Sequence, residues 1–497
     1  MMSLIGIDIG SSAVKIAAYR LDGKLLGVIN NELTPLHPQP GWWEQDPEEV
    51  WHATTRGLGE LVSMDPVRRD PPRALAVSAS GRENFPADAE GKPLGNNKMG
   101  ADIRGEEFEV PPQGAPIPEP WTLSCGHLRE RMDPVFRFLW WRKYHPDILE
   151  KAKYYPDWHG FLTLRLCGRN VSERSLVGRW LVYDLKTKTW SPERLAEYEI
   201  DSRFLPEVLP WGAVIGDVRR QVAAELDLPP DLKVVVGGHD LNCAGVGGGI
   251  SQLGTALLIS GSYENMLIPT MKFPTASMLL RGLSVTPHLG KIERSIYAIC
   301  PTGNAVLNWA RSLLGVSIEK LAGQLAERSH DPSPVLALPY LSGAMLYWQG
   351  GRKLRGVLLG LTLATNPIDI VQAFMESIAY DHVNTLSLLN DEGVKVDHIR
   401  ATGGGTRSEW WTQLKADLLQ VPIEVVAGQE PGTLGAALLA GVGIGVFNDL
   451  DEASQACSGT SRVHLPDPAR ADLHRERLET YRNVVPNLLS TVFDHWL

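Results

Sequence analysis

The chain has 497 residues, of which 43% are hydrophobic and 21% are charged, a composition typical of a soluble globular protein. Its length predicts roughly two to four domains. Lys and Arg number 48 against 58 Asp and Glu, which gives a formal net charge of −10. We therefore expect no nucleic-acid partner, because proteins that bind nucleic acids need a basic face.

The sequence also predicts a cytoplasmic protein without a membrane partner. Residues 1–10 lead into an apolar run with no basic region before it. The weakly polar run 435–447 is too short to span a bilayer. Five dispersed cysteines show no metal-ligand spacing and are typical of reduced thiols.

The first 30 residues have the pattern of a three-stranded meander. Short apolar runs at residues 4–9, 13–19 and 25–30 alternate with turns at 10–12 and 21–24. The first turn, Gly10-Ser11-Ser12, consists of small residues only. It would join two antiparallel strands closely.

The same hairpin pattern recurs in the second half, at residues 255–260, 261–262 and 263–268. Units of strand, glycine loop and helix follow each hairpin; their predicted strands are residues 74–77, 234–236, 398–402 and 423–426. This predicts a duplicated α/β architecture. We place the boundary in the glycine-rich stretch 245–254, which gives domains at 1–247 and 248–497.

The two small-residue turns are candidate phosphate sites. Glycine lets backbone amides approach an anion, and serine hydroxyls add donors. Gly10, Ser11 and Ser12 would serve in one half and Gly261 and Ser262 in the other, so that two facing turns could hold a polyphosphate. An ordinary hairpin turn remains the alternative for either one alone.

Two aspartates lie at predicted strand ends. Asp8 precedes the first turn, where it could hold Mg²⁺ through water beside phosphates; a solvated strand-end carboxylate is the alternative. Asp240 follows Gly237-Gly238-His239 at the carboxyl end of a strand, where α/β sheets bind ligands. It could accept a proton from a substrate hydroxyl, or it could cap the helix that follows.

A third glycine loop, Gly403-Gly404-Gly405, precedes Ser408 and a predicted helix at 408–419. Its backbone could pack against a flat base or ribose. A plain strand-to-helix connection is the alternative.

Together these segments resemble the FGGY family of carbohydrate kinases, which includes xylulokinase, gluconokinase and glycerol kinase. The resemblance covers nearly the whole chain and depends on the order and spacing of several motifs, which are Ile7-Asp8-Ile9-Gly10-Ser11-Ser12 through Lys15, Asp102-Ile103-Arg104, Gly237-Gly238-His239-Asp240, Ser260-Gly261-Ser262, Pro301-Thr302-Gly303 and Gly403 to Ser408.

The resemblance implies two ribonuclease-H-like (actin-like ATPase) domains with an interdomain active-site cleft that closes on MgATP and a sugar. It implies Asp240 as general base and Asp8, with Asp240, as the metal-binding pair. The implied ATP-binding residues are Gly10, Ser11, Ser12, Lys15, Gly261, Ser262, Gly303, Gly404, Gly405 and Ser408.

The substrate loop departs from many sugar kinases of the family, which carry Gly-Gln-x-His at this place. Here it contains Arg82 and Glu83, and this pair is similar to that of glycerol kinase. Arg offers fixed donors and Glu offers acceptors, so we expect both, with Asp240, to bind a xylulose-like ketose or a short polyol. A surface ion pair is the alternative, and Asp133 is then the next candidate substrate residue.

The leading interpretation is therefore an ATP-dependent kinase of a small sugar or polyol, which is compatible with a homodimer. The alternatives are an actin-fold ATPase switch without a small substrate and a non-catalytic, sugar-binding relative. The polar substrate loop favours a hydroxylated substrate, and retention of Asp8, Asp240 and both turns favours catalysis.

Overall fold

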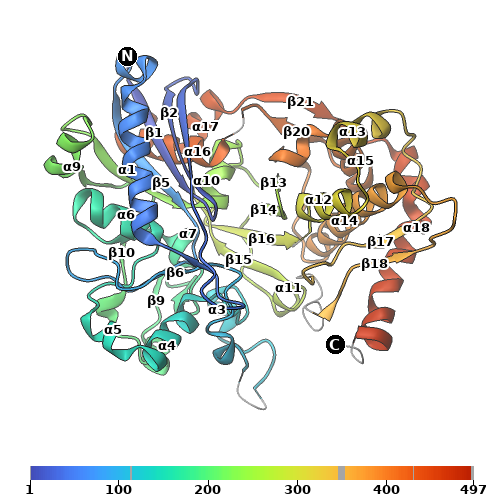
Figure 1. The fold of residues 1–497 in the computed structure, drawn as a ribbon, viewed down its shortest axis with the longest axis horizontal. Helices are drawn as coiled ribbons and strands as arrows, with labels where there is room; N and C mark the ends of the chain where they lie inside the picture. The colour runs from blue at the N-terminus through green and yellow to red at the C-terminus, as the bar shows by residue number, and fades with distance from the viewer. Residues whose placement is uncertain (1, 112–114, 301, 345–352, 429, 494–497) are drawn as a thin grey trace.

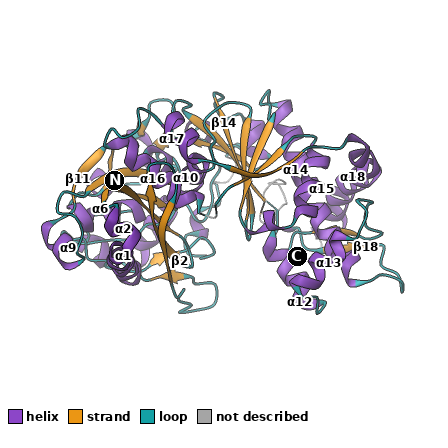
Figure 2. Cartoon of the chain, turned by 90° about the horizontal axis from the view of Figure 1, so that it is seen from above, coloured by secondary structure: helices purple, strands orange, loops and turns teal. Residues whose placement is uncertain are grey.

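The chain forms two lobes, each with one large β-sheet (Figures 1 and 2). The computed structural model describes residues 2–111, 115–300, 302–344, 353–428 and 430–493. The first lobe holds a six-stranded sheet of order β11-β12-β5-β1-β2-β3. Its strands are β1 (Ser3–Ile9), β2 (Ala13–Arg20), β3 (Leu25–Glu32), β5 (Pro72–Ala79), β11 (Val214–Asp217) and β12 (Lys233–His239).

The predicted N-terminal meander is confirmed. β1 pairs antiparallel with β2, which pairs antiparallel with β3, while β5 runs parallel to both β1 and β12. Alternate residues of β1 enter different cores: Ile5 and Ile7 pack on the side of helices α1 (Pro47–Ser63) and α6 (Trp158–Cys167), and Leu4 packs on the opposite side. Both faces of this sheet are therefore buried.

The second lobe repeats the hairpin, as the sequence predicts. β13 (Thr255–Ser260) pairs antiparallel with β14 (Glu264–Thr270) and parallel with β19 (His398–Thr402). The full sheet has the order β15-β16-β14-β13-β19-β20-β21. Its other strands are β15 (Leu283–Pro287), β16 (Arg294–Cys300), β20 (Ile423–Val426) and β21 (Thr460–His464).

Two helices cross between the lobes. α10 (Asp240–Gly247) follows the last parallel strand of the first sheet but packs its Gly245 against Leu267 of the second sheet. α16 (Pro431–Gly443) comes from the second half and packs on β1, β5 and β12. The two helices touch so closely that a Cβ on Gly435 would lie 1.8 Å from the Cys243 carbonyl oxygen. Because of this exchange, the domain division at residue 247 stays a prediction.

The remaining elements surround these sheets, and local sequence starts several of them. Asp46 caps α1 by accepting a hydrogen bond from the Glu48 amide at 2.9 Å, and Asn366 and Asp369 form a capping box on α14 (Pro367–Asp391). The other helices are α2 (Asp65–Arg69), α3 (Thr122–Cys125), α4 (Pro134–Tyr144), α5 (Pro146–Lys151), α7 (Arg174–Val177), α8 (Pro192–Glu197), α9 (Arg220–Glu225), α11 (Ala276–Leu280), α12 (Asn304–Leu313), α13 (Ile318–Ala326), α14 (Pro367–Asp391), α15 (Glu409–Leu419), α17 (Leu450–Cys457) and α18 (Pro468–Leu488), with short helices η1 (Glu106–Phe108), η2 (Ser202–Phe204), η4 (Gly404–Arg407) and η5 (Leu489–Phe493). Short strands are β4 (Glu44–Gln45), β6 (Asn97–Lys98), β7 (Val171–Ser172), β8 (Tyr183–Asp184), β9 (Thr189–Trp190), β10 (Glu207–Val208), β17 (Leu336–Leu338) and β18 (Val357–Leu359).

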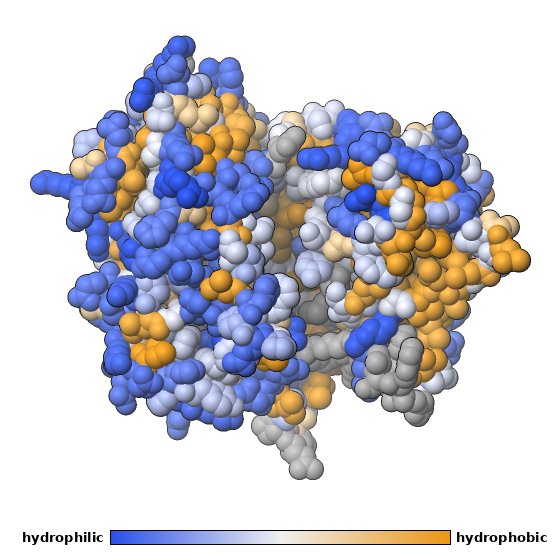
Figure 3. Space-filling model, in the orientation of Figure 1, coloured by the Kyte–Doolittle hydropathy of each residue, from blue (hydrophilic) through white to orange (hydrophobic). Residues whose placement is uncertain are grey.

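The surface is hollowed between the two lobes, near the middle of the face drawn in Figure 3. This hollow is where the sequence predicts a cleft. In the described parts of the chain, no helix has both the length and the apolar character needed to cross a membrane.

Candidate active site

Asp240 lies where the two lobes meet, as the first residue of α10. His239 ends β12 and is the N-cap residue of this helix, with Nδ1 lying 3.3 Å from the Leu241 amide nitrogen. The same ring nitrogen lies 3.3 Å from the hydroxyl of Tyr297, which belongs to β16 of the second lobe. The N-cap is therefore His239 rather than Asp240, and the Asp240 side chain remains 42% exposed.

The Asp240 carboxylate is stabilised in its charged form. Burial raises its pKa, but the His239 ring, 2.9 Å from Oδ1, and the Leu241 amide, which donates at 2.6 Å, more than offset this effect. The pKa of Asp240 consequently lies below its ordinary value. An ionised and partly exposed carboxylate can accept a proton from a nearby hydroxyl.

Asp8 is a second carboxylate near Asp240. Ser78, on the neighbouring strand β5, donates its hydroxyl to Asp8 Oδ1 at 2.5 Å. Burial is the main reason why the pKa of Asp8 is raised to about 6; the Ser78 bond opposes this shift, and the charge of Asp240 adds to it. The two carboxylates are thus close enough to repel each other.

Two repelling carboxylates suit a divalent cation. Mg²⁺ commonly binds through one or two protein carboxylates and completes its octahedron with water and phosphate oxygens. No group of three or more Asp, Glu, His or Cys side chains in the described ranges is arranged to hold a metal. Asp8 and Asp240 therefore fit a magnesium ion shared with a phosphate ligand rather than a site made by the protein alone.

The first predicted phosphate turn joins β1 to β2. The Gly10 amide donates to the Ala13 carbonyl at 3.0 Å, and residues 10–12 are exposed at the tip. Lys15 lies opposite Asp8 in the hairpin and forms a 2.8 Å ion pair with Glu430, just before α16. The turn and the start of α16 therefore lie on the same side of the first sheet as Asp8.

The second turn, at residues 261–263, is held by the start of α12. The amides of Asn304 and Ala305 donate to the carbonyls of Gly261 and Ser262 at 3.0 and 3.1 Å. Gly303 is required here, since a Cβ on it would lie 2.9 Å from the Ser262 carbonyl oxygen. Gly261, Ser262 and Gly303 are thus brought together as predicted, while Pro301 of the same motif lies outside the described residues.

A buried charged cluster beneath this turn was not predicted from the sequence. The Glu264 carboxylate accepts two 2.8 Å bonds from Lys415 Nζ, lies 2.8 Å from His382 Nε2, and accepts the Ser260 hydroxyl. Burial opposes ionisation of Glu264, but Lys415 and His382 lower its pKa to about 2. This carboxylate is fully compensated and supports the turn from inside the lobe.

The third glycine loop borders a cavity of about 540 Å³. Gly404, Gly405 and Ser408 line it from η4 and the N-cap of α15. The opposite walls are largely apolar and come from α12, α13 and α14, through Leu307, Leu321, Leu325 and Met375. Asn304 joins this cavity to the second turn, so a flat base could lie against the glycines with phosphates directed toward that turn.

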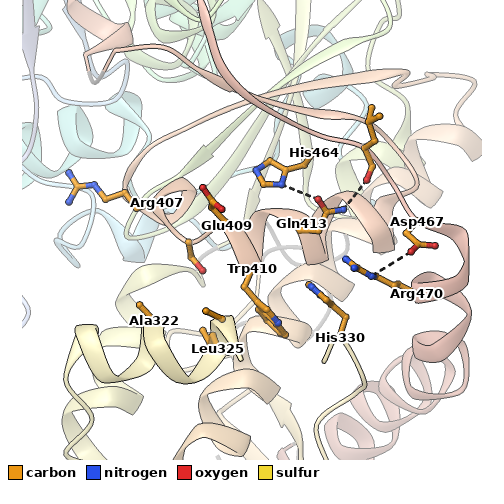
Figure 4. Close-up of a pocket in the computed structure, with 13 residues that line it drawn as sticks. Ala322, Leu325, His330, Arg407, Glu409, Trp410, Gln413, His464, Asp467 and Arg470 are labelled. Atoms are coloured by element: carbon orange, nitrogen blue, oxygen red, sulfur yellow. Dashed lines mark hydrogen bonds and ion pairs between the residues drawn. The ribbon is translucent and has the colours of Figure 1, made fainter. Parts of the chain in front are cut away.

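A larger cavity of about 830 Å³ lies on the other side of the same loop (Figure 4). The His330 and Trp410 rings stack in it with centroids 5.1 Å apart, and Arg407 points away from both. Of the predicted site residues, Ser408 alone is found in its described lining. The smaller cavity, in contrast, reaches the second turn through Asn304.

The substrate loop, at residues 80–84, follows β5 and is buried. Arg82 forms an ion pair with Glu130, with a second contact from Nη2 to Oε1 at 3.5 Å. Glu83 instead accepts a 2.8 Å bond from Trp158 Nε1. Arg82 and Glu83 therefore do not form a surface pair with each other, and the loop is fixed by partners far away in the sequence.

Asp133 has a structural position. It is the N-cap of α4 and accepts the Val135 amide at 2.9 Å and the Leu181 amide at 3.2 Å. Burial is the main cause that raises its pKa to about 7. One backbone amide on each carboxylate oxygen explains the structural position of Asp133, and its binding to substrate stays a prediction.

Three other residues surround the substrate loop: the buried His127 and Arg179, and the partly buried Glu130. The charges of Arg82 and Arg179 both lower the pKa of Glu130, although burial opposes them. Burial, with the same two arginines, lowers the pKa of His127 to about 3, so its ring is neutral. Sequence reasoning missed all three because they are separated from Arg82 by 45 to 97 positions and carry no motif of their own.

The match to known proteins comes in two parts. The N-terminal domain of the FGGY family of carbohydrate kinases matches residues 3–247, and the C-terminal domain of that family matches residues 285–444. The chain belongs to the FGGY family. It is thus an ATP-dependent carbohydrate kinase, as the sequence predicts.

Characterised relatives match this kinase along almost its whole length. It is 28% identical to the xylulose kinase of Escherichia coli, over 98% of this chain and 99% of the relative. It is 26% identical to the L-xylulose/3-keto-L-gulonate kinase of the same organism, over 97% of both chains. The ligand-bound xylulose kinase of Lactobacillus acidophilus superposes with a TM-score of 0.90 at 22% identity, over 100% of both chains, which confirms the actin-like two-domain fold.

Proposed function

We propose that this kinase transfers the γ-phosphoryl group of ATP to a hydroxyl group of a small sugar or polyol, with Asp240 as the general base. The observation that carries the proposal is the position of Asp240 between β12 of the first lobe and Tyr297 of the second, ionised and partly exposed beside Asp8. A substrate held by the 80–84 loop and a nucleotide held by the second lobe would meet at this residue.

In the proposed step the substrate oxygen forms a bond to the γ-phosphorus while the bond to the β,γ-bridging oxygen breaks. Asp240 takes the hydroxyl proton, and ADP leaves with the electron pair of the broken bond. Asp8, with Asp240, would hold the Mg²⁺ ion, which neutralises phosphate charge when it is bound. Most of the rate then comes from positioning and charge stabilisation.

The proposed nucleotide site combines the 540 Å³ cavity with the two turns. The base would lie against Gly404 and Gly405, and the phosphates would extend past residues 261–262 toward residues 10–12 and Lys15. The bonds from α12 to the second turn support this assignment, since they fix the turn at the mouth of the cavity.

The test is ADP release from MgATP with and without a panel of ketoses, aldoses, polyols and sugar acids of three to six carbons. We expect release to depend on one class of substrate and to yield one phosphorylated product per ADP. Release of ADP at the same rate without any sugar would instead indicate an ATPase switch and would contradict the proposal.

A further inference from the structure

Arg179 is a buried cation beside the substrate loop. The proposed phosphoryl transfer gives it no role. It follows α7, and its side chain is packed against the loop: a Cβ on Gly81 would lie 2.8 Å from Arg179 Cγ. Arg179 is only 5% exposed. A cation with so little contact with water needs a compensating anion.

Arg179 lacks such an anion within the described residues. Its Nη1 donates to the Ser284 hydroxyl at 3.4 Å, and its guanidinium lies 4.9 Å from the centre of the Tyr297 ring. Its Nε has no hydrogen-bond partner there, and no ion pair involves it. The remaining compensation comes at longer range from Glu130 and Asp240.

Glu130 is one of the carboxylates that could compensate the charge of Arg179, but it already forms an ion pair with Arg82. Two arginines thus share one paired carboxylate, and burial together with Arg82 lowers the pKa of Arg179 to about 10. The positive charge of Arg179 is therefore not fully compensated by the carboxylates around it. In the second lobe, by contrast, the Glu264 carboxylate is paired with both Lys415 and His382.

Two further buried groups near Arg179 have unused hydrogen-bonding capacity. His127, 1% exposed, has its Nδ1 3.1 Å from the Leu128 carbonyl, while its Nε2 has no partner in the described chain. Arg82 Nε is also unpartnered among these residues. The unprotonated nitrogen of a neutral imidazole accepts a hydrogen bond from a hydroxyl, and guanidinium nitrogens donate hydrogen bonds to oxygen anions.

We infer that Arg179 binds the carboxylate of the substrate, and that this kinase acts on open-chain polyhydroxy acids of the aldonate or ketoaldonate class in preference to neutral sugars and alditols. The inference rests on the proposed function and names the substrate of that same site. The substrate carboxylate supplies the anion that Arg179 lacks, with a bidentate geometry available to the guanidinium, and a substrate hydroxyl supplies the donor for His127.

The inference is tested with matched pairs of compounds. Aldonates of four, five and six carbons are each compared with the alditol that carries CH₂OH in place of the carboxylate. Turnover is measured by ADP release, and binding is measured separately by calorimetry in the presence of MgADP. We expect wild-type kinase to favour one aldonate over its alditol in both measurements.

Arg179→Met removes the charge and keeps much of the side-chain volume, and Arg179→Lys keeps a charge without the planar fork. We expect R179M to lower the aldonate-to-alditol ratio of kcat/KM on the order of 10²-fold, with an intermediate loss for R179K. Arg203→Met is the matched control, because the Arg203 side chain is 56% exposed on the surface, paired with Asp201. R203M should leave the ratio unchanged.

Activity on alditols but not on aldonates would leave the proposed function standing and overturn this inference. Equal loss on both members of a pair in R179M would also overturn it, since Arg179 would then act on the phosphoryl group or on loop geometry. If no compound is turned over, the proposed function fails, and calorimetry then tests the binding part of the inference alone: aldonate binding that R179M abolishes supports Arg179 as the carboxylate site, and equal binding of alditol and aldonate contradicts it. If R179M does not fold, the same criteria apply to R179K.

Discussion

The two hairpins that open the two halves of the chain have the same strand pairing, but their carboxylates, Asp8 and Glu264, have different surroundings. In the first lobe, Asp8 accepts a hydrogen bond from one neutral partner, Ser78; burial, with the repulsion of Asp240 added to it, raises its pKa to about 6. In the second lobe, Glu264 is surrounded by Lys415, His382 and Ser260, and its pKa is lowered to about 2. One carboxylate is left under-compensated and the other is neutralised by the protein itself.

We propose that this difference separates a functional acid, Asp8, from a structural one, Glu264. An under-compensated carboxylate beside an exposed turn gains stability when a cation binds, whereas a fully paired buried carboxylate gains nothing from a ligand. A duplicated framework therefore places comparable hairpins in both lobes, and the side chains around each hairpin decide which one takes part in chemistry. The buried cations differ in the same way: Lys415 is paired with the Glu264 carboxylate, whereas Arg179 has no ion-pair partner among the described residues.

The largest expected effect is on the base. Asp240→Asn should lower turnover about 10²–10⁴-fold, because the amide cannot accept the substrate proton. Affinity for ADP, measured by calorimetry, should change little, since the proposed nucleotide cavity lies in the second lobe. Turnover near the wild-type value would show that Asp240 is not the general base.

The next effect is on the structural carboxylate. Glu264→Gln leaves Lys415 buried beside a neutral amide and should lower the free energy of unfolding by about 3–5 kcal/mol, the usual cost of removing one partner of a buried pair. Urea unfolding at pH 7 measures this loss. A value below about 1 kcal/mol would mean that the cluster contributes little and that the contrast with Asp8 is wrong.

Asp8→Asn should raise the free energy of unfolding, in contrast to Glu264→Gln, and the size of this effect should depend on pH. The pKa of Asp8 is about 6 in the folded chain against 3.8 ordinarily, so the folded state binds the extra proton and loses stability as pH rises from about 4 to 6. In ligand-free protein, D8N should therefore be about 2–3 kcal/mol more stable than wild type above pH 7 and equal to it below pH 4. Unfolding measured across this range would contradict the account if D8N were destabilised throughout, as E264Q is expected to be at pH 7.

The smallest effect concerns the glycine loop of the second lobe. A Cβ on Gly405 would lie 2.0 Å from Ser260 Oγ, whereas a Cβ on Gly404 would meet its nearest atom, Asn304 Nδ2, at 3.7 Å. Gly405→Ala should cost about 1–3 kcal/mol of stability through overpacking, and Gly404→Ala is the matched control with a smaller cost. Thermal unfolding without ligand measures both, and equal costs would show that the loop does not rest on the Glu264 cluster.

Local patterns predicted the strands, both turns and the glycine loops, because each depends on residues close together in the sequence. The predicted runs at 398–402 and 423–426 coincide with β19 and β20. The pairing of Arg82 with Glu130 and of Glu83 with Trp158 could not be predicted, since 48 and 75 positions separate these partners. The exchange of α10 and α16 between lobes depends on close backbone contact at Gly435, which the sequence shows only as one more glycine.

We propose that the second lobe binds the nucleotide and that the first lobe supplies the base and the sugar site. Amide hydrogen exchange with MgADP, and then with MgADP plus the preferred substrate, tests it most directly. We expect MgADP to protect residues 403–408 and both turns, and the substrate to add protection at 80–84 and 127–131. Nucleotide protection confined to residues 1–240 would contradict this division of the site.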